Sequence, residues 1–314
     1  MNRRQWLQQS SLAALMIGGA GLPRALAVAE DSKRRKLLVY TRSVGFQHSV
    51  IARKEGKLSL AERLVTELGK KHNIEVVCMK DGRVFEAKDF DTFDGFLFQT
   101  QGDLTSEKCL DGSPPMSRAG KKALLDAVAG GKGFIGCHCA SDTFHSKGGQ
   151  WENQTGEQVD PYIAMLGGEF IRHGQQQNSW MRVVDPKFPG LDGVKDFEKH
   201  EEWYSLKNFA PDLHVVLVQD TEGMKNLDYE RPKYPATWAR KHKKGRVFYT
   251  SMGHREDVWE SEIMQKMLAG ALAWTLGRVE AEVKPNLNDV APNASVLPSP
   301  KKKAQTNRIE ISIV

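Results

Sequence analysis

Between Lys36 and Gly277 the sequence alternates short apolar stretches of strand length with longer stretches whose apolar residues recur at helical spacing. Residues 36–41 (KLLVYT) predict a strand, residues 56–72 an amphipathic helix, and residues 73–79 (NIEVVCM) a second strand. The strands are continuous apolar runs, which is typical of a parallel sheet covered by helices on both faces. This rhythm predicts an α/β fold, a three-layer sandwich with a mainly parallel sheet.

The second half of this region is less regular but contains the same kinds of segment. Further strands are predicted over residues 93–100, 133–139, 179–185, 213–219, 235–240 and 246–251. Helices are predicted over residues 117–131, which begin at a serine and stop at two glycines, and over residues 262–277. Because there is no internal repeat and no obvious linker, residues 36–277 are expected to form one domain. After Gly277 the regular spacing of apolar residues stops, and residues 278–314 are expected to be an extended or disordered tail.

The first 27 residues have the pattern of an export signal rather than of a folded segment. They contain an arginine pair (Arg3 and Arg4), an apolar run over residues 12–22 and a small-x-small cleavage site at residues 25–27. The apolar run is too short to span a bilayer as a helix. The arginine pair favours the twin-arginine route, with a Sec signal and an uncleaved anchor as alternatives. We therefore expect a protein that is periplasmic or otherwise exported and whose mature chain begins near Val28.

The charge balance excludes some partners. Removing the signal takes away three arginines and no acidic residue, so the formal charge falls from +6 to about +3. Basic and acidic residues are interleaved along the remaining chain, and the basic cluster Lys301-Lys302-Lys303 lies in the tail. This balance does not indicate a nucleic-acid-binding protein. No other segment is apolar for long enough to cross a membrane, and no nucleotide cofactor is expected.

Five of the nine histidines lie at the ends of segments predicted to be buried strands. His48, His138, His173 and His254 follow apolar runs within a few residues, whereas His200 opens the segment KHEEWY. In open α/β sheets, ligands and catalytic groups gather beyond the carboxyl ends of the strands. Histidines delivered there could share one pocket, where imidazole serves as metal ligand or proton carrier. The alternative is that the histidines are scattered by chance and individually structural.

The segment GKGFIGCHCASDTF places His138 where a glycine-punctuated strand runs into a sharp turn. In α/β hydrolases such an elbow holds a nucleophile, whereas an imidazole suits metal binding or proton transfer. Asp142 could orient His138, ligate a metal or cap the next helix. In a strand, Cys137 and Cys139 would share the face opposite His138, with Cα atoms near the upper limit for a disulfide. We expect both to be small core residues, with metal ligation or nucleophilic attack as alternatives.

Acidic, basic and aromatic side chains accompany the histidines. In an extended segment His200 and Glu202 would share one face, so Glu202 is expected in the pocket unless KHEEWY is simply a charged edge strand. Arg172 lies beside His173 and could support the site. Aromatic residues near these motifs suit the apolar faces of a sugar ring, although core packing explains most of them equally well: Phe46, Trp151, Tyr162, Trp203, Tyr204 and Trp259.

Five ordered motifs give the chain a family resemblance: LLVYTRSVGFQH, GKGFIGCHCASDTF, YIAMLGGEFIRH, HEEWY and PATWARKHKKGRVFYTSMGH. In this order they resemble the ThuA-like family, named for trehalose utilisation, over about residues 37–277. The resemblance implies a flavodoxin-like α/β sandwich similar to class I glutamine amidotransferases. In that superfamily a cysteine occupies the elbow and a histidine follows a late strand, and here His138 and His254 match these positions. Histidine at the elbow argues against glutamine hydrolysis, and the family's link to sugar and keto-sugar catabolism suggests a carbohydrate partner.

Three functional hypotheses follow. The first is an exported carbohydrate-active enzyme that uses a divalent metal such as zinc, or a histidine and carboxylate set, on a sugar or keto-sugar. Its metal ligands would be a subset of His48, His138, His173, Glu202 and His254. Its catalytic groups would be His138, His254, Glu202 and Asp142, and its substrate contacts His48, Arg172, Trp203 and Tyr204. The second hypothesis is a non-catalytic sugar-binding or accessory protein. The third is an amidase-like hydrolase that uses Cys137 or Cys139.

Overall fold

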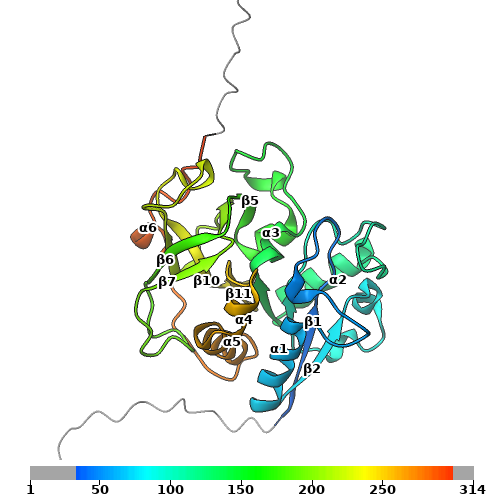
Figure 1. Ribbon diagram of the computed structural model, residues 1–314. Helices are drawn as coiled ribbons and strands as arrows, with labels where there is room; N and C mark the ends of the chain where they lie inside the picture. Colours follow the sequence, from blue (N-terminus) through cyan, green and yellow to red (C-terminus); the bar gives the residue numbers. More distant parts are fainter. Residues whose placement is uncertain (1–32, 300–314) are drawn as a thin grey trace, which may run out of the picture.

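The computed structural model of the protein describes residues 33–299. The predicted export signal (residues 1–27) and residues 300–314 of the predicted tail lie outside the described residues. A nine-stranded mixed sheet runs through the molecule in the strand order β2-β1-β3-β4-β11-β10-β9-β6-β7, with helices on both faces (Figure 1). This arrangement confirms the predicted flavodoxin-like α/β class.

The sheet has a parallel part and an antiparallel part. The parallel part is made, in spatial order, of β2 (Ile74–Met79), β1 (Arg35–Tyr40), β3 (Gly95–Phe98), β4 (Gly133–Cys137) and β11 (Gly245–Thr250). It continues into the antiparallel strands β10 (Tyr234–His242), β9 (His214–Asp220), β6 (Gln177–Val183) and β7 (Phe197–Glu201). A separate antiparallel pair is formed by β5 (Glu169–His173) and β8 (Tyr204–Lys207).

Within residues 33–299 six α-helices accompany the strands: α1 (Leu60–Lys71), α2 (Arg118–Ala129), α3 (Pro161–Leu166), α4 (Glu256–Glu260), α5 (Glu262–Thr275) and α6 (Leu287–Val290). Helices α1 and α5 bury apolar side chains in the same core cluster, whereas α2 and α3 contribute to a second cluster. The sheet separates the two clusters, which gives the three layers that the sequence predicts.

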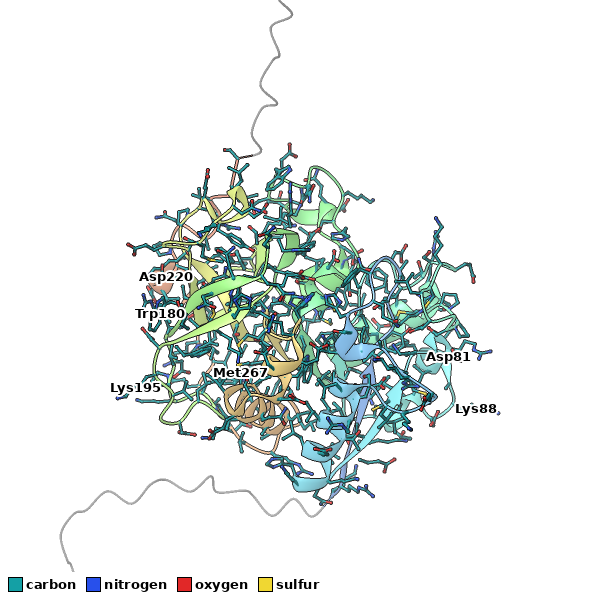
Figure 2. The ribbon with its side chains drawn as sticks, in the orientation of Figure 1. Asp81, Lys88, Trp180, Lys195, Asp220 and Met267 are labelled. Carbon is teal, nitrogen blue, oxygen red and sulfur yellow. The ribbon has the colours of Figure 1, made fainter. Side chains whose placement is uncertain are left out.

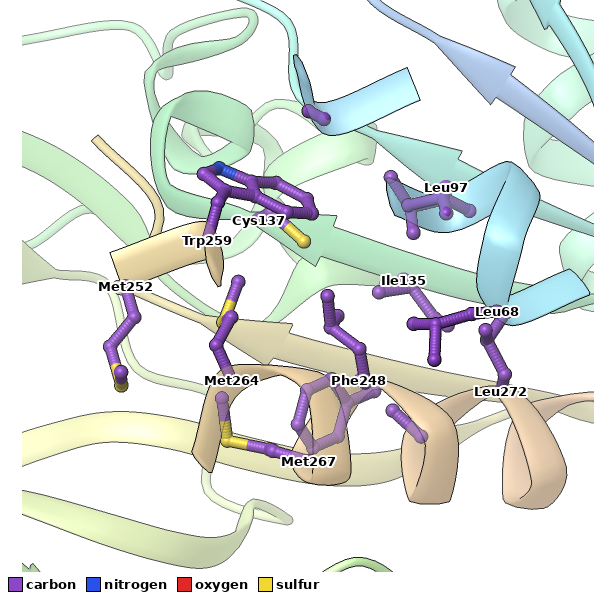
Figure 3. Packing of buried hydrophobic residues seen from close by; sticks show 14 of the residues in the cluster. Leu68, Leu97, Ile135, Cys137, Phe248, Met252, Trp259, Met264, Met267 and Leu272 are labelled. Carbon is purple, nitrogen blue, oxygen red and sulfur yellow. The ribbon is translucent and has the colours of Figure 1, made fainter. Parts of the chain in front are cut away.

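Side chains of β1 show why the parallel strands are continuously apolar. Leu37 and Val39 belong to the cluster beneath α1 and α5, while Leu38 and Tyr40 belong to the other cluster. Successive side chains of a strand point to opposite faces, so a sheet covered on both sides buries all of them. Full burial of one such side chain contributes roughly 1.5–3 kcal/mol to folding. Figure 3 shows this packing in the first cluster, where α1, α5, β4 and β11 meet.

The start of α1 is fixed by a capping box. The Ser59 hydroxyl accepts a hydrogen bond from the backbone N–H of Glu62 at 3.4 Å, and the Glu62 carboxylate accepts one from the backbone N–H of Ser59 at 2.9 Å. The same carboxylate accepts from the Thr41 hydroxyl at 2.7 Å and pairs with Arg53 at 2.8 Å. The helix is therefore tied to the loop that follows β1, which carries one of the candidate site residues.

The chain after Gly277 continues to pack against the domain. The Asn286 side chain accepts a hydrogen bond from the backbone N–H of Val215 at 2.6 Å, and Ala291 and Ala294 are buried. Up to residue 299, therefore, the expected tail lies along the domain and contains the short helix α6. Among residues 33–299, no helix combines the length and apolarity that a membrane crossing requires.

Candidate metal centre

Four side chains from four separate segments converge at the carboxyl ends of the parallel strands. The ligand atoms of His48, His138, Glu202 and His254 all lie within 4.8 Å of one another. His48 follows β1, His138 follows β4, His254 follows β11, and Glu202 lies directly after β7. The ring centroids of the three histidines are 4.9–5.4 Å apart. The structure thus brings together four of the five residues proposed as metal ligands.

His138 occupies the predicted elbow directly after β4. Its backbone φ is +44°, in the left-handed region that residues other than glycine rarely adopt and that costs roughly 1–3 kcal/mol. Its carbonyl accepts hydrogen bonds from the Tyr249 hydroxyl at 2.8 Å and the Ser141 hydroxyl at 3.2 Å, which hold this conformation. The imidazole is fully buried. The ring therefore packs within the core and does not line solvent.

The two nitrogens of His138 have different surroundings. Nδ1 donates to the backbone carbonyl of Ser251 at 2.8 Å, which leaves the Nε2 lone pair free. Nε2 points into the cluster, 3.5 Å from Oε2 of Glu202, and has no aligned hydrogen-bond partner among residues 33–299. A ring nitrogen held by a carbonyl while the other faces a shared point is the arrangement found around metal-binding histidines.

His254 and Glu202 are both positioned by Glu201, the last residue of β7. The Glu201 carboxylate is fully buried and accepts three backbone N–H groups, from Glu202 at 2.7 Å, Gly253 at 3.0 Å and His254 at 3.2 Å. Nδ1 of His254 then lies 2.9 Å from Oε2 of Glu202. Glu201 was not among the predicted site residues, because an alternating strand pattern places it on the face away from Glu202.

His48 is buried in the loop between β1 and the 3-10 turn Ser49–Ile51, and neither of its ring nitrogens has a hydrogen-bond partner among the described residues. The loop is held by Gln101, whose side-chain oxygen accepts the backbone N–H groups of Gly45 at 2.7 Å and Phe46 at 2.9 Å. The Phe46 ring packs edge-on against His48 and is 55% exposed. No contact within residues 33–299 therefore fixes the tautomer of His48, and either ring nitrogen can present the single lone pair of the neutral imidazole in a nearly enclosed setting.

The electrostatics of the cluster favour a neutral imidazole at His48 and an ionised carboxylate at Glu202. Burial and the neighbouring His138 and His254 lower the pKa of His48 to about 2. Burial disfavours the charged form of Glu202, but the neighbouring rings of His138 and His254 outweigh burial and hold the pKa of this carboxyl below its usual range. Burial also opposes protonation of His254, yet Glu202 raises the pKa of this imidazole. Neutral imidazole and ionised carboxylate are the forms that bind metal ions.

The fifth proposed ligand, His173, lies at the edge of the cluster. Its Nδ1 is 3.3 Å from Oε1 of Glu202, whereas His138 and His254 face Oε2. The His173 side chain is 41% exposed and packs against Tyr204, 5.8 Å between ring centroids. Its neighbour Arg172 is exposed and pairs with Asp228 at 3.6 Å. His173 is thus separated from the cluster by the Glu202 carboxylate.

Asp142 does not contact His138, and no helix follows it to be capped. Its carboxylate instead contacts Nε2 of His145 at 2.9 Å and accepts from Nε2 of Gln101 at 2.9 Å. His145 also contacts Glu169 at 3.1 Å through Nδ1, so one imidazole bridges two carboxylates. Hydrogen bonds that His145 donates to Asp142 and Glu169 raise the pKa of its imidazole to about 9. His145 was not predicted as a site residue, because it follows no apolar run.

The segment KHEEWY turned out to contain the charged edge strand. His200 is exposed on β7, and its Nδ1 lies 3.0 Å from the side-chain oxygen of Asn178, so it does not share a face with Glu202. Trp203 is fully buried and donates its indole N–H to the backbone of Gln177 at 3.0 Å. Tyr204 is also buried, with its ring 4.0 Å from that of His138. Both aromatic rings support the site from the core side instead of offering an open stacking face.

Most of the other aromatic residues singled out for a sugar face are core residues. Tyr162 and Trp259 are fully buried, while Phe46 is exposed and Trp151 is half-buried.

The two cysteines of the elbow, Cys137 and Cys139, are buried and have free thiols, as expected. They do not share a face, however: β4 ends at Cys137, and Cys139 lies in the following 3-10 turn against the other core cluster. Burial raises the pKa of both thiols, which disfavours the thiolate that nucleophilic attack needs.

Comparison with known proteins identifies the family. The family model for ThuA, described as trehalose utilisation, matches residues 36–275. A ThuA-like protein from Bacteroides uniformis is similar in structure, with a TM-score of 0.56 and 17% identity over 84% of this chain and 99% of that chain. A ThuA-like protein from Parabacteroides merdae has a TM-score of 0.53 and 14% identity over 80% of this chain and 93% of that chain. These low identities show the fold alone, and no curated protein matches the sequence. Because the family model spans most of the chain, the protein belongs to the ThuA family.

Proposed function

We propose that this protein is an exported, metal-dependent enzyme that acts on a sugar or keto-sugar. The observation that carries the proposal is the set of four convergent ligand atoms, with buried nitrogens of His48, His138 and His254 that lack hydrogen-bond partners within residues 33–299. A buried polar atom without a partner costs roughly 1–3 kcal/mol. A bound cation would supply the missing partner for all three rings at once.

The donor set indicates the kind of metal. Three imidazoles and one carboxylate suit zinc or another first-row divalent ion, whereas calcium and magnesium prefer oxygen ligands. Four protein ligands would close a tetrahedral site, so an ion that accepts five or six ligands would keep positions open for substrate. When bound there, such an ion would polarise a sugar carbonyl or hydroxyl.

The surrounding residues can hold and move a proton. His173 is half exposed and lies against Oε1 of Glu202, so it can exchange protons with solvent beside the cluster. The backbone of Ser251 fixes the tautomer of His138, and Glu201 holds the backbone at His254. The carbohydrate substrate class is supported by the description of the family, trehalose utilisation.

The direct test is metal analysis of protein purified without added metal. We expect about one equivalent of a first-row divalent ion, and His138→Ala should lose it because a cluster ligand is removed. His200→Ala is the matched control, because this histidine is exposed on β7 and bonded to Asn178. If folded wild-type protein takes up no divalent ion from zinc, manganese, iron or nickel solutions, the metal-dependent function is wrong.

A further inference from the structure

A second cavity opens at the same edge of the sheet as the metal centre. Its volume is about 550 Å³, and loops that follow β1, β2 and β3 line it. In the sheet order, β2 and β3 lie on opposite sides of β1, so the direction in which successive strands are added to the sheet reverses at β1. In open α/β sheets such a switch point is where ligands bind. Figure 2 shows Asp81, one of the lining residues, on the side of the molecule formed by β2.

The loop after β1 connects this cavity to the metal centre. Gln47 lines the cavity and donates its side-chain N–H to Asp111 at 3.3 Å, while the next residue, His48, belongs to the metal cluster. Neighbouring residues of one short loop thus contribute to the two sites. A molecule in the cavity would contact the same loop that carries a proposed metal ligand.

The charges in the cavity lining are compensated. Lys80 is nearly buried, donates to the Thr41 carbonyl at 2.6 Å and pairs with Asp111 at 2.9 Å. Arg53 pairs with the Glu62 carboxylate at 2.8 Å. A phosphate or carboxylate ligand would need a cation that is free to pair with it. The lining therefore suits a neutral ligand that both donates and accepts hydrogen bonds.

Two apolar side chains complete the cavity. Met79, at the end of β2, is 37% exposed, and Leu110 is 57% exposed, although both are large hydrophobic residues. An apolar surface beside hydrogen-bonding side chains matches a sugar, which has C–H faces and hydroxyl groups. Small-molecule sites commonly occupy roughly 300–1,000 Å³, so the cavity has room for a mono- or disaccharide.

We propose that this cavity binds a neutral saccharide beside the metal centre. The proposal rests on the proposed carbohydrate function and adds a binding subsite to it. Gln47, Lys80 and Asp111 supply donors and acceptors for the hydroxyl groups, and Met79 and Leu110 contact a C–H face.

Titration calorimetry of the full-length mature protein with trehalose, glucose and inorganic phosphate tests the proposal. Gln47→Ala and Leu110→Ser should each raise the saccharide Kd about tenfold, the equivalent of one lost polar or apolar contact. Gln158→Ala and Leu58→Ser are the matched controls, because both residues are exposed and lie outside the cavity lining. The controls should leave the Kd within about twofold of wild type.

Three outcomes would overturn the proposal. One is the absence of saccharide binding to wild-type protein, and another is phosphate binding that Gln47→Ala weakens, which would make the cavity an anion site. The third is saccharide binding that His138→Ala abolishes while Gln47→Ala and Leu110→Ser leave it unchanged. That last result would place the sugar at the metal centre alone and support the proposed function without the second subsite. Metal content, measured on the same samples, separates a failure of the metal-dependent function from a failure of this subsite.

Discussion

Nδ1 of His138 donates a hydrogen bond to the backbone carbonyl of Ser251 at 2.8 Å. Because a carbonyl oxygen only accepts, this contact keeps the proton on Nδ1 and directs the Nε2 lone pair toward the cluster. Ser251 directly follows β11, and His254 lies three residues later. The loop at the end of β11 therefore orients His138, the proposed ligand that follows β4, and also supplies the proposed ligand His254.

Metal affinity should fall as the pH is lowered. Glu202 raises the pKa of His254 above its ordinary value of 6.5, so in the metal-free protein a proton competes for this ring at a higher pH than it would for an ordinary histidine. His48 should not add to the effect, because its pKa is lowered to about 2. Competition with a chromophoric chelator between about pH 5 and 9 measures the slope. The exposed-site variant His200→Gln should retain the slope, whereas a pH-independent affinity in wild type would contradict the prediction.

Replacing Glu201 by glutamine should weaken metal binding roughly 10–100-fold, the range measured for residues that orient metal ligands. The amide retains the shape of the side chain but loses the charge that accepts the N–H groups of Glu202, Gly253 and His254. Glu198→Gln on the exposed face of β7 is the control. Equal metal affinities for wild type and Glu201→Gln, in folded protein, would rule out a positioning role.

The stability of the metal-free protein should decrease between about pH 6.5 and 9 because of His145. Its folded-state pKa is raised to about 9 by Asp142 and Glu169, so the stabilisation is fully present below the unfolded value of 6.5 and is lost as the pH rises through 9. The side chain is 48% exposed, so solvent screening keeps the effect small. Thermal melts of chelated wild type and His145→Gln measure it. Parallel pH profiles for the two proteins would show that the bridge contributes nothing.

Thiol reagents should leave Cys137 and Cys139 unmodified in the native protein. Both thiols are fully buried, and burial raises the pKa of each. Cys78 and Cys109 are less buried and serve as internal controls in the same sample. Peptide mass spectrometry after alkylation, with and without denaturant, gives the result. Rapid native modification of Cys139, accompanied by loss of activity, would instead favour the amidase-like hypothesis.

Export should depend on the arginine pair. Replacing Arg3 and Arg4 together by lysine should block transport if the route is twin-arginine, because that route reads the paired arginines. Mass spectrometry of periplasmic protein should find the mature chain beginning near Val28. Unchanged export of the double variant would point to the Sec route, and retention of Met1 in the periplasmic protein would show that the signal is not cleaved.

Much of the fold and part of the site could be predicted because they depend on local pattern. Continuous apolar runs identify strands that are buried on both faces, as β1 shows, and turn residues mark where those strands end. The carboxyl ends of parallel strands meet at one edge, so His48, His138 and His254 could be expected together before any contact was known.

Glu202 was expected in the pocket, but for a reason that the structure does not bear out, and the role of Glu201 was not predicted. A two-residue period would place Glu202 on the same face of the strand as His200. β7 ends at Glu201, however, and the chain then turns so that Glu201 faces inward and Glu202 faces the cluster. The edge position of β7, paired only through β6, leaves His200 exposed. Local periodicity gives no information about where a strand stops pairing.

By itself, the sequence determined the α/β rhythm and the three histidines that follow parallel strands, because strand periodicity and strand ends are local properties of the chain. Tertiary structure alone decided that Glu201 turns inward to support the cluster, that His173 stands outside it, and that Asp142 pairs with His145 and not with His138. These pairings join residues whose distance depends on how separate segments pack, and packing is a property of the whole chain.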